Sequence, residues 1–190
     1  LMDGNFEMNG LRPMLRLENS TICFVGFGNI ARNLYRKMRA FFGHVVAVDP
    51  YITDRSMYPD VEFLELHEAL SRADVVTMHL QLTPATRGII GEQEFQSMKP
   101  GVIFVNTARG GLVDEAALMR ALDSGRISYC ALDVLGTENF SESPLLHREN
   151  VILTPHISWC SEAALAELQK KTAQNVVETF LHGEPIYRAV

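Results

Sequence analysis

Short apolar runs alternate along this chain with stretches whose apolar residues recur every three or four positions. The runs are rich in β-branched and aromatic residues and predict buried strands at about 21–26, 45–49, 61–64, 74–80, 102–106, 127–132 and 151–153. The helical spacing predicts helices at about 29–42, 67–72, 84–98, 114–125 and 161–182, with Gly43, Gly125 and Gly183 ending three of them. Strands that alternate with helices in this way form a doubly wound parallel sheet, so the predicted fold class is α/β.

The first predicted strand and helix are joined by a glycine turn, GFGNIA at 26–31. Gly26 allows a tight turn, Gly28 lets backbone N–H groups approach a pyrophosphate, and Ala31 is a third small residue that lets the helix pack against the strand. The positive end of the helix then faces the phosphates. Glycine turns also join strands to helices in proteins that bind no ligand, so the motif by itself is weak evidence.

An acidic residue strengthens the prediction of a dinucleotide site. Asp49 ends the second predicted strand about 20 residues after the turn, where a carboxylate accepts hydrogen bonds from the adenosine ribose hydroxyls. The alternative is an ordinary acid at a strand end. Because the same carboxylate would repel a 2′-phosphate, Asp49 favours NAD over NADP, although the nearby Arg55 weakens that preference.

Other polar residues follow the later strands, at the edge where ligands bind in such sheets. Arg109 lies on a glycine-flanked loop and can clamp a carboxylate with two hydrogen bonds, or it pairs with Asp114 or Glu115 at the surface. Asp133 ends the sixth strand and Glu138 lies in the loop beyond it, where either carboxylate can be merely solvated.

His156 follows the last predicted strand and precedes a capped helix. That place suits a proton donor as well as a hydrogen-bonded structural histidine, and His79 can line the same cleft. No cluster of histidines or cysteines has the spacing of a zinc site, so the sequence predicts no metal. Neither a G-x-S-x-G elbow nor a P-loop lysine is present.

Composition narrows the class of protein. The chain has 190 residues, enough for one domain with a full core, and its formal net charge of −6 gives no basic footprint for nucleic acid. No apolar run approaches the about 20 residues of a membrane span, and the first residues carry no secretory signal. Cys23, Cys130 and Cys160 form no C-x-x-C pair, so we expect reduced thiols and a cytoplasmic protein without a membrane partner.

Several segments in this order resemble the D-isomer-specific 2-hydroxyacid dehydrogenases, the D-3-phosphoglycerate dehydrogenase-like group, from about Leu17 to the C-terminus. They are VGFGNIA at 25–31, VDPY at 48–51, NTARGGLVD at 106–114, ALDVLGTE at 131–138 and TPHI at 154–157. The resemblance implies a Rossmann-type NAD-binding domain. It also implies that Arg109 binds the substrate carboxylate, that Glu138 pairs with the proton donor His156, and that Asp133 holds the nicotinamide carboxamide.

The residues expected to bind the cofactor are Gly26, Gly28, Asn29, Ile30, Asp49, Thr107, Ala108, Arg109, Asp133 and His156. Those expected to be catalytic are Arg109, Glu138 and His156. Four positions depart from the family pattern: Ala31 replaces a glycine, Asn29 a frequent basic residue, and Gln81 and Asn139 prolines. The ending His-Ile-Ser-Trp resembles glycerate dehydrogenases and the C-terminal-binding corepressors, and Trp159 either narrows the substrate pocket or packs between domains.

Family chains are usually far longer, so we expect a fragment. Residues 1–19 are then a connector from a missing upstream substrate domain, 20–160 the NAD-binding domain, and 161–190 a C-terminal helix that packs back toward the substrate domain. Cofactor domains of this family commonly pair, and the segments around 84–130 and the last helix offer apolar faces. We therefore expect a homodimer.

The expected function is NAD-dependent interconversion of a small 2-keto acid and a D-2-hydroxy acid by hydride transfer, with the fragment inactive without its upstream domain. One alternative is an NAD(H)-sensing, corepressor-like binding protein built on the same fold. A second is another Rossmann-type enzyme, such as a methyltransferase. The segments at 107–109 and 154–156 favour the dehydrogenase.

Overall fold

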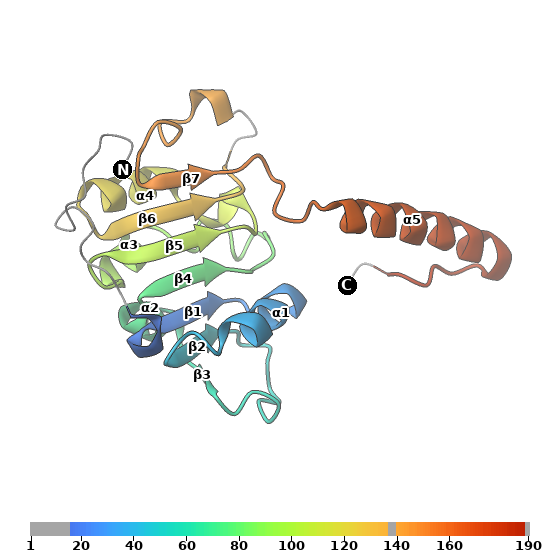
Figure 1. The fold of residues 1–190 in the computed structure, drawn as a ribbon, viewed down its shortest axis with the longest axis horizontal. Helices are drawn as coiled ribbons and strands as arrows, with labels where there is room; N and C mark the ends of the chain where they lie inside the picture. Colours follow the sequence, from blue (N-terminus) through green and yellow to red (C-terminus); the bar gives the residue numbers. More distant parts are fainter. Residues whose placement is uncertain (1–15, 137–139, 189–190) are drawn as a thin grey trace. The chain divides into compact units, whose positions relative to one another are not determined.

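The computed structural model describes residues 16–136 and 140–188, and the chain divides into two compact units, Leu1–Pro155 and His156–Val190. The first unit is built on a seven-stranded parallel sheet with the order β3-β2-β1-β4-β5-β6-β7 (Figure 1). Its strands are β1 (Thr21–Val25), β2 (His44–Val48), β3 (Val61–Phe63), β4 (Val75–Met78), β5 (Val102–Asn106), β6 (Ile127–Leu132) and β7 (Val151–Leu153). The predicted doubly wound α/β sheet is therefore confirmed, with each predicted strand in place to within two residues.

Four helices connect these strands: α1 (Asn29–Met38), α2 (Leu66–Arg72), α3 (Glu92–Ser97) and α4 (Glu115–Asp123). Short 3-10 helices occur at Leu17–Asn19, Gly110–Leu112 and Phe140–Glu142. Helix α1 covers one face of the sheet over β1 and β2, and α2, α3 and α4 cover the other face (Figure 1).

The two faces are separated by the alternation of side chains along β1. Ile22 and Phe24 belong to the cluster under α1, whereas Cys23 and Val25 belong to the larger cluster under α2, α3 and α4. All four are buried, so β1 is apolar on both sides, as a central parallel strand requires.

Within the first unit, no described helix covers the part of the α1 face that β5, β6 and β7 form. Strand register places Ile103, Val105, Tyr129, Ala131 and Ile152 on that side of β5, β6 and β7. Two of them are largely exposed, Tyr129 by 61% and Ile152 by 67%. An apolar sheet face of this kind is a candidate contact surface.

The prediction for the first helix was wrong at its C-terminal end. Helix α1 ends at Met38 rather than Phe42, and Phe41 N–H donates to the Met38 carbonyl in a tighter turn. Gly43 is not a left-handed helix cap. A Cβ at Gly43 would lie 2.1 Å from the Glu18 carbonyl oxygen, so glycine is needed there because two backbone segments meet.

The predicted helix from residue 84 is also wrong in its first half, because only Glu92–Ser97 is helical. Gly88 has a φ of +64°, and its N–H donates to the Gly111 carbonyl at 2.9 Å. Ile90 then forms a parallel bridge with Val113. This segment extends along a distant part of the chain instead of coiling on itself.

The other predicted helix ends are confirmed. Asp114 Oδ1 caps α4 by accepting from Ala116 N–H at 2.9 Å and Ala117 N–H at 3.2 Å, and Gly125 follows this helix with a φ of +71°. Cys23 and Cys130 lie buried in strands, and burial raises the pKa of each thiol to about 12, whereas Cys160 is exposed.

The second unit consists mainly of helix α5 (Glu162–His182). Ser161 Oγ caps its start by accepting from Ala164 N–H at 3.0 Å, and Gly183 ends it with a φ of +80°, as predicted. The chain then turns back, since Asn175 Nδ2 donates to the Tyr187 carbonyl and Tyr187 N–H donates to Asn175 Oδ1. No helix in the described parts of the chain is long and apolar enough to cross a membrane.

Candidate cofactor and catalytic site

The glycine turn after β1 is held between two neighbouring strand ends. Gly26 has a φ of +89° and donates its N–H to the Val48 carbonyl of β2 at 2.9 Å. A Cβ at this position would lie 2.9 Å from the backbone carbonyl of His79, beyond β4. Both the conformation and the space therefore require glycine at position 26.

Gly28 needs a different explanation, because neither its conformation nor its neighbours require glycine. Its φ is −74°, and a Cβ built there would have no atom from elsewhere in the described chain within 4 Å. Gly28 is the N-cap of α1 and provides no side-chain cap for the first N–H groups of that helix. An open, uncapped helix start fits a pyrophosphate, whose oxygens accept from such N–H groups.

Asp49 is fixed against this turn by two backbone hydrogen bonds. Its Oδ2 accepts from Phe27 N–H at 2.8 Å, and its Oδ1 accepts from Tyr51 N–H at 3.0 Å. The carboxylate at the end of β2 is thereby held beside the middle residue of the glycine turn. Each oxygen still has a lone pair that can accept from a ribose hydroxyl.

Arg32 is a neighbour of the turn that the sequence analysis did not identify. Its Nε donates to the Phe27 carbonyl at 2.9 Å, and its guanidinium lies 5.8 Å from the centre of the Tyr58 ring. The sequence signal for this residue is a basic side chain four positions after Gly28. The contact between Arg32 and the Phe27 carbonyl could not be predicted, because it depends on the geometry of the turn.

A pocket of about 580 Å³ opens beside the turn, at the carboxyl ends of β4 and β5. It is lined by Ile30, His79, Leu80, Gln81, Leu82, Thr107, Ala108 and Arg109. Four predicted cofactor residues therefore share one cavity, and its size suits a ligand site. His79 is among them, as the sequence suggested, and burial lowers the pKa of its imidazole to about 4. Its Nε2 lies 3.0 Å from Thr77 Oγ1.

The turn that carries Arg109 is shaped by the buried side chain of Asn106. Asn106 Oδ1 accepts from Ala108 N–H at 3.0 Å, and Asn106 Nδ2 donates to the Arg109 carbonyl at 2.9 Å. Asn106 lies in the predicted motif but was not identified as a site residue. A buried amide at a strand end is the sequence signal for such a role.

The Arg109 guanidinium is exposed and donates to the Ala108 carbonyl at 2.6 Å. Within the described residues it forms no ion pair with Asp114 or Glu115, the surface partners that the sequence left open. Asp114 caps α4, and Glu115 Oε1 accepts from Gly136 N–H. The guanidinium thus keeps donors for a ligand.

Close backbone packing joins the Arg109 turn to the segment that leaves β6. A Cβ at Gly110 would lie 1.9 Å from the Leu135 carbonyl oxygen, so glycine is required by this approach. This contact fixes the backbone at Leu135, three residues before Glu138 in the sequence. Glu138 itself lies outside the described residues, so its predicted role stays a prediction.

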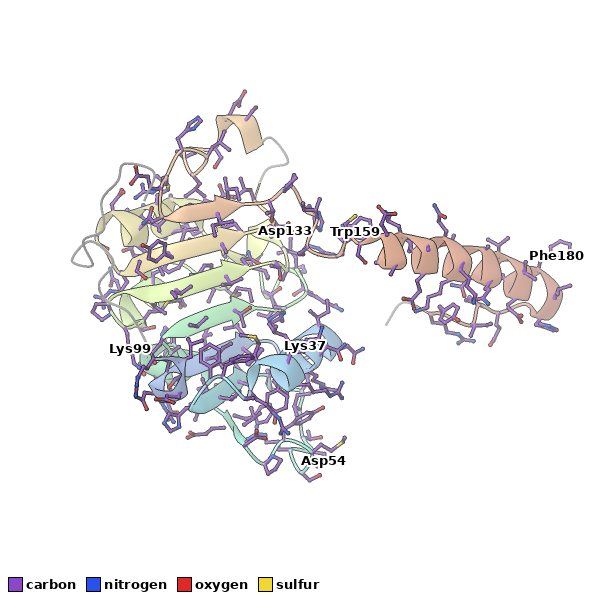
Figure 2. The ribbon with its side chains drawn as sticks, in the orientation of Figure 1. Lys37, Asp54, Lys99, Asp133, Trp159 and Phe180 are labelled. Atoms are coloured by element: carbon purple, nitrogen blue, oxygen red, sulfur yellow. The ribbon has the colours of Figure 1, made fainter. Side chains whose placement is uncertain are left out.

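Asp133 is buried, with 2% of its surface exposed, and lies just after β6 (Figure 2). Its Oδ1 accepts from Thr154 Oγ1 at 2.5 Å, and its N–H donates to the Asn106 carbonyl at 3.0 Å. A buried carboxylate at this edge is anchored by the two neighbouring strands and is not merely solvated, which was the alternative for this residue.

The first unit brings together most of the predicted cofactor residues at one edge of its sheet. These are Gly26, Gly28, Asn29, Ile30, Asp49, Thr107, Ala108, Arg109 and Asp133, all at or just after the carboxyl ends of β1, β2, β5 and β6. His156 is exposed and opens the second unit, so its predicted place beside this edge stays a prediction. In the parts of the chain that the structure describes, no group of three or more acidic, histidine or cysteine side chains has metal-site geometry.

Comparison with known families and proteins agrees with this geometry. The family model "D-isomer specific 2-hydroxyacid dehydrogenase, NAD binding domain" matches residues 1–158. The D-3-phosphoglycerate dehydrogenase of Mycobacterium tuberculosis (strain ATCC 25618 / H37Rv) is 41% identical over 174 residues, which are 90% of this chain and 32% of that protein. The glycerate dehydrogenase of Methylorubrum extorquens is 35% identical over 176 residues, 91% of this chain and 54% of that protein.

A solved relative is similar in structure as well. The NAD complexed form of a D-isomer specific 2-hydroxyacid dehydrogenase from Lactobacillus delbrueckii ssp. bulgaricus superposes with a TM-score of 0.86 at 27% identity, covering 97% of this chain and 62% of that one. The chain therefore spans about a third to about half of the length of these curated relatives.

The two N-cap glycines provide a matched test of the glycine turn. Gly28→Ala should raise the Kd for NADH by about tenfold or more, because the methyl group enters the space from which a pyrophosphate reaches the α1 N–H groups. Gly91→Ala makes the same change at the N-cap of α3, where a Cβ is in ordinary contact with Glu94 Oε2 at 3.5 Å and the Gly88 carbonyl oxygen at 3.8 Å. Calorimetric titration should show a normal Kd for Gly91→Ala. Equal affinities for both variants would contradict the assignment.

Proposed function

This chain belongs to the D-isomer-specific 2-hydroxyacid dehydrogenase family, and we propose that it is the cofactor domain of an NAD-dependent enzyme that interconverts a small 2-keto acid and a D-2-hydroxy acid. The observation that carries the proposal is the open, uncapped helix start at Gly28, beside a fixed Asp49 and a pocket that ends at Arg109. The curated relatives named above, a D-3-phosphoglycerate dehydrogenase and a glycerate dehydrogenase, support a small hydroxy acid as substrate.

In this proposal the glycine turn holds the dinucleotide. The N–H groups of Asn29 and Ile30 bind the pyrophosphate, Asp49 binds the adenosine ribose, and Asp133 binds the nicotinamide carboxamide. The chemistry that NADH supplies when bound is the two-electron reduction of the keto carbon. The protein contributes orientation and charge.

Three side chains act on the substrate in this proposal. Arg109, whose guanidinium is exposed and not ion-paired within the described residues, fixes the substrate carboxylate through two parallel hydrogen bonds. His156 donates its proton to the keto oxygen, and Glu138 orients the imidazole and stabilises its charged form. In the oxidising direction the same imidazole accepts the hydroxyl proton.

Cofactor preference tests the role of Asp49. NADH should bind at least about tenfold more tightly than NADPH, because the carboxylate repels a 2′-phosphate. Asp49→Asn keeps a side-chain oxygen for Phe27 N–H but removes the charge, so the ratio of the two affinities should approach one. The matched control is Asp54→Asn, which changes an exposed acid that accepts from Ser56 N–H in the same loop. Equal or tighter NADPH binding by the parent in calorimetry would contradict the preference.

Kinetic measurements on the complete protein distinguish the proposed proton donor, His156, from Arg109, which is proposed to bind the substrate carboxylate. His156→Ala should lower kcat for keto-acid reduction by about 10²–10⁴-fold and leave NADH affinity unchanged. Arg109→Lys should instead mostly raise KM, because an ammonium cannot form the two parallel bonds. His147→Ala, which removes an exposed histidine, serves as the control. Full activity of His156→Ala across a pH–rate profile would contradict its role as the acid, whereas a parent protein without keto-acid reduction would favour a binding function.

We also propose a homodimer formed by this domain, with the open sheet face as the contact. Tyr129 and Ile152 are exposed there, and Tyr129 lies in the segment expected to pair. Light scattering should give twice the 21.3 kDa of the chain, and the double variant Tyr129→Glu with Ile152→Glu should return it to one copy. Met57→Glu, a change at another exposed apolar residue, should leave the mass unchanged. A parent mass of one copy at high concentration would rule the dimer out.

A further inference from the structure

His156 has an unusual backbone conformation. Its φ is +56°, and it is the one residue other than glycine with a positive φ in the described part of the chain. Residues with a side chain adopt this left-handed region rarely, and they persist there only where surrounding contacts determine the conformation. The structure must therefore supply a contact that holds His156.

That contact comes from Trp159. Its indole Nε1–H donates to the His156 carbonyl oxygen at 2.9 Å, so a side chain closes the turn from 156 to 159. The next turn is closed by Cys160 N–H, which donates to the Ile157 carbonyl at 2.9 Å. Helix α5 then starts at once, capped by Ser161. The indole N–H thus links the His156 backbone to the segment that leads directly into α5.

Trp159 is about half exposed, so this hydrogen bond contributes to the position of its ring alongside packing. The residue is 51% exposed and carries the label at the start of the second unit in Figure 2. A tryptophan held by packing would bury most of its surface. Here the polar N–H is directed at the backbone, while much of the ring remains accessible.

We propose that Trp159 is a positioning residue for His156. Its indole N–H holds the His156 backbone in the left-handed conformation and thereby fixes the direction in which the imidazole leaves the main chain. This inference rests on the proposed role of His156 as proton donor. It differs from the two roles that the sequence suggested for Trp159, a wall of the substrate pocket or a contact between domains.

The hydrogen bond itself is tested first, without reference to activity. The chain contains one tryptophan, so ¹⁵N-tryptophan labelling gives one indole N–H resonance. Its exchange with solvent should be at least about tenfold slower than that of free indole, because a bonded N–H exchanges only after local opening. Exchange as fast as in free tryptophan would overturn the proposal.

The positioning role is tested in the complete protein by replacing Trp159 with benzothienylalanine, which has the same shape but sulfur in place of N–H. We expect kcat to fall by roughly three- to tenfold, with KM and the Kd for NADH unchanged. Trp159→Phe should show the same loss of kcat. Replacement by 5-fluorotryptophan, which keeps the N–H, should restore the parent value.

The alternatives give different results. If the ring forms a pocket wall, benzothienylalanine keeps the parent kcat and Trp159→Phe raises KM, which would overturn the proposal. Failure of the proposed function is recognised separately, because the parent protein would then show no keto-acid reduction in the same assay. A protected indole N–H together with an active His156→Ala variant would place the error in the choice of acid and not in the turn.

Discussion

The approach of Gly26 to the backbone of His79 is the constraint on which the candidate site depends. A Cβ there would lie 2.9 Å from the His79 carbonyl, so the chain leaves β1 in contact with the end of β4. The same turn is bonded to the end of β2 through Gly26 N–H and through Asp49. Three strand ends are thereby tied at one point, which fixes Asp49, the start of α1 and the pocket wall relative to one another. A substitution at Gly26 would disturb all of them together.

The fold could be predicted from the sequence wherever local pattern decides the structure. Parallel strands buried on both faces form continuous apolar runs, and all seven were found. The errors arose where distant backbone segments meet. Gly43 lies against Glu18, and Gly88 and Ile90 bond to Gly111 and Leu112, so neither stretch forms the helix that its local spacing suggests. A pattern read from neighbouring residues cannot reveal these contacts, because the partners lie far away in the sequence.

The candidate site shows the same division. The glycine turn and Asp49 could be predicted because their spacing is short and fixed. For Arg109 the sequence allowed two alternatives, a ligand or a surface ion pair with Asp114 or Glu115. It could not decide between them, because the partners of these two acids depend on which loop packs beside the acids in the folded chain. In the structure Asp114 caps α4 and Glu115 accepts from Gly136 N–H, so neither forms an ion pair with the arginine. The roles of Asn106 and Arg32 depend in the same way on contacts that form only in the folded chain.

The two histidines that the sequence associated with the cleft differ in their surroundings. Burial holds the pKa of His79 at about 4, and its Nε2 lies 3.0 Å from Thr77 Oγ1. An imidazole with that pKa is almost entirely neutral at pH 7. Keeping His79 neutral suits a wall of a cofactor pocket, since a buried charge without a partner would be costly. His79 is therefore not the expected proton donor in the proposed reduction. The proposed acid, His156, is exposed, and its left-handed backbone conformation is accompanied by the hydrogen bond from Trp159.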